Sequence, residues 1–178
     1  MNEIALTAIK LLFLLGFTLH NIEEAIWLPK WSEYAKKFHK PVGSNEFIFA
    51  DIIITIIGYL LTAVDFIIGS PGDLINYIYL GFVGMMGVNV IFPHLFATVV
   101  LKKYAPGLLT GMLLNLPLSM IIIYWHIQNG IKIVNLLAAI VIVAIFILSS
   151  LKYLFRIGRK IIDYSNIESP NEANSADA

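Results

Sequence analysis

The sequence predicts an all-α fold, a bundle of about five transmembrane helices. Of the 178 residues, 58% are hydrophobic and only 13% are charged, and the mean hydropathy is +0.81, which is far above that of soluble domains. Five apolar segments each contain the ~20 residues that a helix needs to cross ~30 Å of hydrocarbon. Proline, glycine and charged residues separate them, as in connecting loops. We therefore expect a polytopic membrane protein.

The expected helices follow one another with short connections. They lie near residues 4–28, 47–68, 74–101, 105–127 and 131–155. Together they predict a single transmembrane helical domain over residues 1–160. The last stretch, 161–178, is polar and poor in aromatic residues, and such composition predicts a disordered tail.

The basic residues predict the orientation of the bundle, because Lys and Arg accumulate on the cytoplasmic side of short loops. They cluster in the first loop, in the third loop and after the fifth segment: Lys30, Lys36, Lys37, Lys40, Lys102, Lys103, Lys152, Arg156, Arg159 and Lys160. The second loop has none, and the fourth has only Lys132. The N-terminus is therefore expected outside and the C-terminus in the cytoplasm, with the chain in the bacterial cytoplasmic membrane.

Composition and missing motifs exclude several classes of protein. The chain has no cysteine, which excludes disulfides, thiolate metal sites and cysteine nucleophiles. Equal numbers of basic and acidic residues, 12 of each, argue against a nucleic-acid partner. The sequence also lacks a Gly-x-Ser-x-Gly elbow, a Gly-x-Gly-x-x-Gly turn and a phosphate-binding loop.

The first expected helix ends in HNIEEAIW, a polar string at the end of an apolar run. Glu23 and Glu24 follow His20 by three and four residues, so all three side chains lie on one side of the helix. A charge inside the membrane costs at least ~2.5–3.5 kcal/mol and is usually paired, liganded or functional. We favour a functional site. In the alternative, the helix leaves the membrane near Trp27, and Glu24 reaches the lipid headgroups.

Polar residues of the other expected helices fall at a similar depth, given a rise of about 1.5 Å per residue. These are Asp51, Asn89, His94 and Asn115. Pro93 leaves the carbonyl of Asn89 without its helical donor and predicts a kink. Asn89 and His94 lie about 140° apart on an ideal helix. They can belong to one site only if the kink or a broad cavity brings them together. In the alternative interpretation, the kink serves helix packing and the histidine is hydrogen-bonded within the protein.

The second expected helix carries a polar stripe at spacings of three and four residues: Asp51, Thr55, Tyr59, Thr62 and Asp65. Such a stripe is either a water-filled path for protons or a hydrogen-bonded interior face, and we favour the interior face. Lys10 is the one basic residue inside the first helix.

Four parts of the chain together resemble the HXXEE-motif family of small bacterial membrane proteins. They are HNIEE at 20–24, the segment 89–94, YAPG at 104–107 and LNLP at 114–117, and the resemblance spans roughly residues 10–125. It implies a protein of unknown function that is suspected of being catalytic because of its His/Glu motif. That suspicion applies here to His20, Glu23, Glu24 and His94.

Histidines and carboxylates inside a helical bundle favour a divalent metal such as Zn, Fe or Mn. We expect His20, Glu24 and His94 to be ligands. The glutamate that does not bind the metal would act as general base, while Asn89 and Asn115 would orient the substrate. The hypothesis is a metal-dependent hydrolase acting on a lipid or a membrane-embedded peptide near the cytoplasmic leaflet.

Two alternatives keep the same residues. A proton- or cation-coupled transporter would join the cluster to the polar stripe. A non-catalytic assembly or interaction protein would use the cluster as an interhelical hydrogen-bond network. Gly107-x-x-x-Gly111 fits either a dimer contact or an internal contact, so the oligomeric state is left open.

Overall fold

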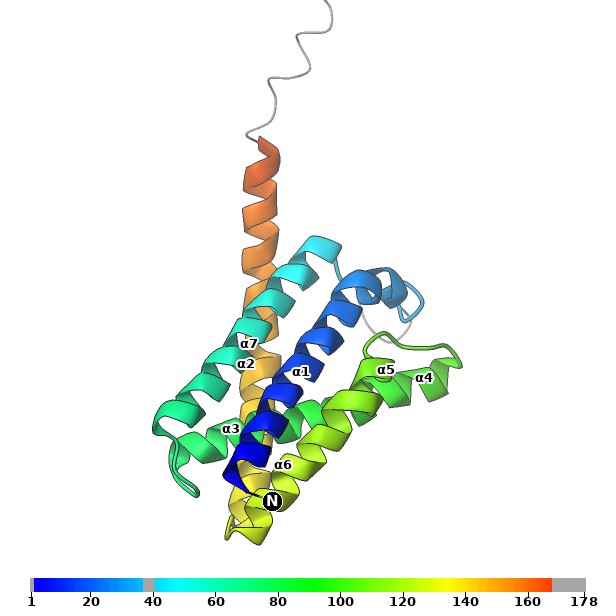
Figure 1. Ribbon diagram of the computed structural model, residues 1–178. Coiled ribbons are helices and arrows are strands. Elements are labelled where there is room, and N and C mark those ends of the chain that lie inside the picture. The colour runs from blue at the N-terminus through cyan, green and yellow to red at the C-terminus, as the bar shows by residue number, and fades with distance from the viewer. Residues whose placement is uncertain (1, 37–40, 168–178) are drawn as a thin grey trace, which may run out of the picture.

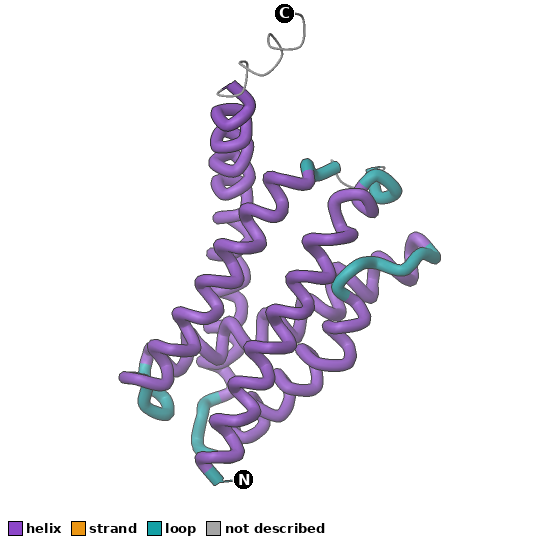
Figure 2. The backbone as a smooth tube through the Cα atoms, turned by 45° about the horizontal axis from the view of Figure 1, so that its top comes forward, coloured by secondary structure: helices purple, strands orange, loops and turns teal. Residues whose placement is uncertain are grey.

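The fold is entirely helical in the part of the chain that the structure describes, residues 2–36 and 41–167 of a computed structural model. Helices and loops account for all of it, with no strand in that part (Figure 2). Five helices are long and apolar enough to cross a membrane: Glu3–Ser32, Ser44–Ile68, Leu74–Leu101, Leu108–Gln128 and Ile133–Ile161. The prediction of an all-α protein with five such helices is confirmed.

Three of the five are regular helices: α1 (Glu3–Ser32), α2 (Ser44–Ile68) and α7 (Ile133–Ile167). The other two are interrupted by π-helical segments. The third consists of α3 (Leu74–Asn89), π-helical Val90–Leu95 and α4 (Phe96–Leu101), and the fourth of α5 (Leu108–Thr110), π-helical Gly111–Asn115 and α6 (Leu116–Gln128). The first interruption contains Pro93, which predicted it, and the second ends just before Pro117.

The five helices alternate in direction along the chain (Figure 1). The N-terminus, the α2–α3 turn and the α6–α7 turn lie at one end of the bundle. The end of α1, the start of α2 and the α4–α5 loop lie at the other, and α7 runs the whole length and projects beyond them. The two ends of the described chain therefore lie at opposite ends of the bundle.

The predicted disordered tail, 161–178, begins too early. Helix α7 continues to Ile167, because no proline or glycine interrupts 161–167 and each residue added to an existing helix gains a hydrogen bond without a new nucleation step. Residues 168–178 lie outside the described residues, as do Lys37 and Lys40 of the first loop.

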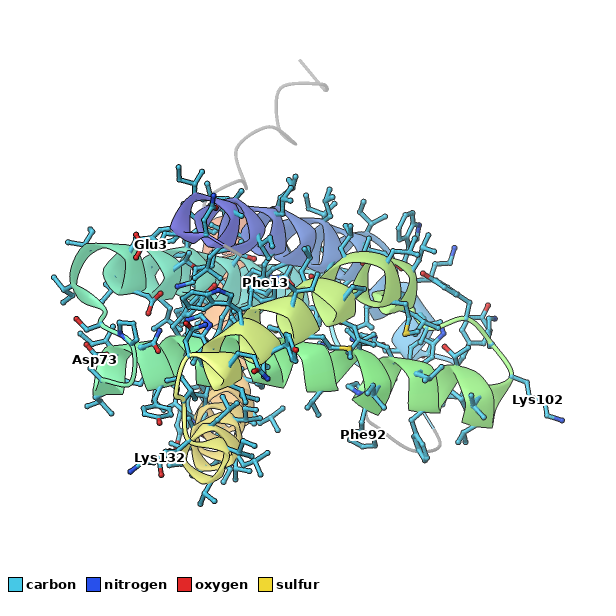
Figure 3. The ribbon with its side chains drawn as sticks, turned by 60° about the horizontal axis from the view of Figure 1, so that its bottom comes forward. Glu3, Phe13, Asp73, Phe92, Lys102 and Lys132 are labelled. Atoms are coloured by element: carbon cyan, nitrogen blue, oxygen red, sulfur yellow. The ribbon has the colours of Figure 1, made fainter. Side chains whose placement is uncertain are left out.

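The apolar core is centred on aromatic side chains of α1 and α3. Phe17 meets Phe82 edge-on with ring centroids 5.2 Å apart, and Phe13 meets the same ring edge-on at 6.2 Å. Phe13 points into the space between the helices, whereas Phe92 points away from the bundle (Figure 3). Gly58 of α2 allows this close packing, since a Cβ there would lie 2.6 Å from Phe17 and 2.8 Å from Phe82.

A buried ion pair joins α1 to α2 near the N-terminal end of the bundle. Lys10 Nζ lies 2.7 Å from Asp65 Oδ2, and both side chains are almost completely buried. Asn76 donates to the other oxygen of Asp65 at 3.0 Å, and the Lys10 ammonium lies 4.8 Å from the centre of the Tyr79 ring. Lys10 is therefore paired rather than isolated within its helix.

Most of the polar stripe on α2 is a hydrogen-bonded face toward α1. Asn21 donates to Thr55 at 2.7 Å, and the hydroxyls of Thr18 and Tyr59 lie 3.0 Å apart. Asp65 pairs with Lys10 as described. The interior-face interpretation of the stripe is confirmed for Thr55 and Asp65, whereas the side chain of Tyr59 is exposed and Asp51 faces a cavity described below.

We expect Lys10→Met to lower the free energy of unfolding by about 3–5 kcal/mol, because it leaves the Asp65 carboxylate buried without its partner. Adding Asp65→Asn should recover much of this loss, since the amide oxygen still accepts from Asn76. Unfolding in detergent, followed by circular dichroism, measures the effect. Lys132→Met at an exposed position serves as the control, and equal stability of the Lys10 and Lys132 variants would contradict the prediction.

Candidate functional site

The predicted ligands of the first and third crossing helices meet in one cluster. Glu24 Oε1 lies 2.8 Å from His94 Nε2 and 3.8 Å from His20 Nε2. The two imidazole rings stand edge to face with centroids 5.0 Å apart. Both histidines are fully buried and Glu24 is partly exposed. The site is thus shielded on the histidine side and accessible on the carboxylate side.

A π-helical turn places Asn89 and His94 together. The hydrogen bonds of a π-helix run between residues five apart, which brings such residues toward the same face. Asn89 Nδ2 accordingly lies 3.1 Å from His94 Nε2 and 3.4 Å from His20 Nε2. The kink thus permits the shared site that an ideal helix would not.

His20 is oriented by the loop that precedes α5. Its Nδ1 lies 2.8 Å from the carbonyl oxygen of Gly107, and only a protonated Nδ1 can donate to that oxygen. The lone pair of a neutral ring is therefore on Nε2, the atom that faces Glu24. A backbone carbonyl bound to the distal nitrogen in this way is the usual partner of a metal-ligating histidine.

Gly107 is required at this position for two reasons. Its φ of 90° lies in the left-handed region that favours glycine. A Cβ would also lie 2.8 Å from the Cε1 atoms of both His20 and His94. From the sequence, Gly107 is expected only in a helix-packing or dimer contact, and the YAPG string that contains it is the available signal for its role beside the histidines.

Glu23 anchors the same loop and does not face the two histidines. Its carboxylate accepts from the backbone N–H of Gly107 at 2.8 Å, from the N–H of Thr110 at 3.1 Å and from the Thr110 hydroxyl at 2.6 Å. The hydroxyl of Tyr104 donates to it as well. Four donors occupy this carboxylate, so the structure favours a positioning role over the predicted role of general base.

Tyr104 lies in the loop between the third and fourth crossing helices. Burial of the hydroxyl raises its pKa to about 12, and its hydrogen bond to Glu23 acts in the same direction. The phenol therefore stays protonated and continues to donate to Glu23 over the physiological pH range.

Asn115 lies apart from the cluster. It is fully buried against Gly16 of α1, where a Cβ would come within 3.3 Å of its Oδ1. Gly16 precedes His20 by one helical turn. Neither amide atom of Asn115 has a hydrogen-bond partner among the described residues. Asn115 was predicted to orient a substrate, but it makes no hydrogen bond to either histidine.

A cavity of about 250 Å³ adjoins the cluster. Its polar wall includes Glu24, Asp51, Asn89 and His94. The remaining wall is mostly apolar and comes from α1, α2, α3 and α7: Phe17, Leu28, Trp31, Phe47, Ala50, Ile54, Met85, Met86, Ile147, Leu148 and Leu151. Asp51 thus joins the site at the depth that the sequence predicted.

Three ligand atoms in this cluster suit a metal ion. One atom each from His20, Glu24 and His94 lies within 4.8 Å of the other two. Zinc binds imidazole nitrogen and carboxylate oxygen at about 2.0–2.2 Å, which separates the ligand atoms of a tetrahedral site by about 3–3.5 Å. Two of the three separations between the ligand atoms, 2.8 Å and 3.8 Å, bracket this range, and the third is at most 4.8 Å.

Comparison with known proteins gives one family and one relative to report. A family model described as "Protein of unknown function with HXXEE motif" matches residues 11–122. A Bacillus subtilis protein, "Uncharacterized protein YrkK", is 50% identical over 150 residues, which cover 84% of this chain and 94% of the relative. No solved structure is significantly similar to the chain.

We expect Glu23→Gln to destabilise the protein by about 1–3 kcal/mol, because an amide group turns a donor toward N–H groups that need an acceptor. The 104–110 loop should also be cleaved faster by protease. Thermal unfolding and limited proteolysis in detergent measure the two effects. Glu33→Gln, an exposed change at the end of α1, is the matched control, and identical behaviour of the two variants would refute the anchoring role.

Proposed function

The chain belongs to the HXXEE-motif family of unknown function, and we propose that it is a multi-pass protein of the bacterial cytoplasmic membrane that carries a metal-dependent hydrolytic site. The observation that carries this proposal is the convergence of His20, Glu24 and His94 from two helices that lie far apart in the sequence. The substrate would be a lipid or a membrane-embedded peptide.

The chemistry of the donors supports a divalent metal. Two neutral imidazoles and one carboxylate suit Zn, Fe or Mn, and three protein ligands leave a coordination position for water or substrate. A bound ion would supply an acidified water and polarise a carbonyl or phosphoryl oxygen. His20, Glu24 and His94 would hold it, with His20 kept in the correct tautomer by Gly107.

Other side chains of the site would bind and orient the substrate. Asn89 is the neutral polar group closest to both imidazoles, and its amide is placed to hydrogen-bond a substrate beside the ligands. Glu24 borders the cavity, so its second oxygen is available to accept a proton in the role of general base. Because Glu23 is occupied by the loop, that role falls to Glu24.

The arrangement of the basic residues supports a site near the cytoplasmic leaflet. Lys30 lies in the last turn of α1, and Lys102 and Lys103 come directly after α4. The candidate site lies toward these same ends of the first and third crossing helices. These ends lie at the end of the bundle where α7 projects (Figure 1), and α7 carries further basic residues near its C-terminal end. By the positive-inside rule this end faces the cytoplasm.

We expect wild-type protein, purified in mild detergent without chelator, to contain close to one divalent metal ion per chain by plasma mass spectrometry. His20→Ala and His94→Ala should each lose at least nine-tenths of it, because a site with three protein ligands loses one of them. Thermal melting of each variant establishes that it is folded.

His126→Ala is the matched control for these variants. His126 is also buried, but its Nδ1 bonds to the carbonyl of Ile122 and it lies outside the cluster. This variant should keep its metal. Metal-free wild-type protein, or equal metal in the folded His20 and His126 variants, would overturn the proposed site.

A further inference from the structure

The cavity beside the cluster is lined by two acidic side chains, and the carboxyl group of one of them, Asp51, has no partner among the described residues. Asp51 and Glu24 both line it, whereas no Lys or Arg does. Glu24 is engaged by His94. The Asp51 carboxylate is half-buried and makes no hydrogen bond or ion pair with any residue in the described part of the chain.

An unpaired carboxyl group at this position selects against anionic ligands. A phosphate or carboxylate beside Asp51 would place two like charges together in a medium that screens poorly, which is unfavourable. A cationic group would instead give Asp51 the partner that it lacks, because a desolvated carboxylate is stabilised chiefly by a nearby opposite charge. The cavity is therefore complementary to a cation.

A second unpartnered group lies on the same wall. Trp31 lines the cavity, and its buried indole N–H has no hydrogen-bond partner among the described residues. An indole N–H can only donate a hydrogen bond, so a ligand that pairs with it must carry an acceptor.

The rest of the wall would accommodate a hydrocarbon chain. It is formed by apolar side chains of α2, α3 and α7: Phe47, Met85, Met86, Ile147, Leu148 and Leu151. The cavity is therefore lined by an acidic group, a hydrogen-bond donor and an apolar surface.

We propose that the cavity binds an amphiphile whose head carries an ammonium group and a hydrogen-bond acceptor such as an ester or amide carbonyl. The ammonium pairs with Asp51, the acceptor takes the Trp31 N–H, and the alkyl chain packs on the apolar wall. This proposal names a substrate class for the proposed function. That such a ligand is hydrolysed rests on the proposed function. The binding itself requires no metal.

Three ligands of equal chain length test the charge preference. Decylamine, decanol and decanoate are each added to protein in neutral-lipid nanodiscs, and binding is measured by native mass spectrometry. We expect wild-type protein to bind decylamine at least tenfold more tightly than decanol, with decanoate weakest. Asp51→Asn should reduce the amine preference to about threefold or less, while decanol binding stays unchanged and reports an intact cavity.

Asp73→Asn is the matched control. Asp73 is the N-cap of α3 and does not line the cavity, and asparagine caps a helix as well as aspartate does, so this variant should keep the full preference. Equal binding of amine and alcohol by wild-type protein, or an unchanged preference in Asp51→Asn, would overturn the inference.

The same experiment separates this inference from the proposed function. Binding is measured on chelator-treated protein as well as on protein as purified, with metal content determined in parallel. An amine preference in protein that never holds metal would support the cavity assignment while refuting the metal chemistry. Stoichiometric metal without an amine preference would refute the cavity assignment alone.

Discussion

The site depends on the way α1 holds a single peptide group, that of Gly107. The N–H of Gly107 donates to Glu23, and its carbonyl accepts from His20. Both polar atoms of this glycine are thus bonded to side chains one helical turn apart. Both bonds are buried, and a buried backbone group without a partner is costly. The 104–110 loop therefore lies against α1 at the point where these two residues bind it.

This attachment accounts for the spacing of the HxxEE string. The histidine and the first glutamate, three residues apart, hold the loop. The second glutamate is rotated by one further position and faces the cavity, where it meets His94. A single helical segment therefore presents two loop-binding groups and two site groups, with His20 belonging to both sets. We infer that loop position and imidazole orientation are coupled, because the same hydrogen bond determines them.

The distribution of buried polar groups divides the bundle into two ends. At one end, Lys10 and Asp65 neutralise each other and Asn76 donates to the pair, so that neither buried charge is left uncompensated. At the other end, the Asp51 carboxyl group and the Trp31 N–H are without partners among the described residues. Unsatisfied groups in a buried site are costly, and they are therefore the groups for which a ligand is the natural explanation.

Part of this picture follows from the sequence alone. The number of helices, their approximate limits and the depth of His20, Glu24, His94 and Asp51 all follow from residue counting, because the rise along a helix is a local property. Convergence at one depth is then expected for helices of a bundle. Pro93 likewise indicated that the third helix is interrupted near the site.

Only the tertiary structure decided which way each side chain points. Rotation about a helix axis depends on packing and on π-helical turns, which no count of residues supplies. For this reason Asn89 reaches both histidines, whereas Asn115 at a similar depth faces Gly16 instead. Glu23 and Glu24 are neighbours of identical chemistry, and their roles separate only because Glu23 bonds to the 104–110 loop while Glu24 meets His94 beside the cavity.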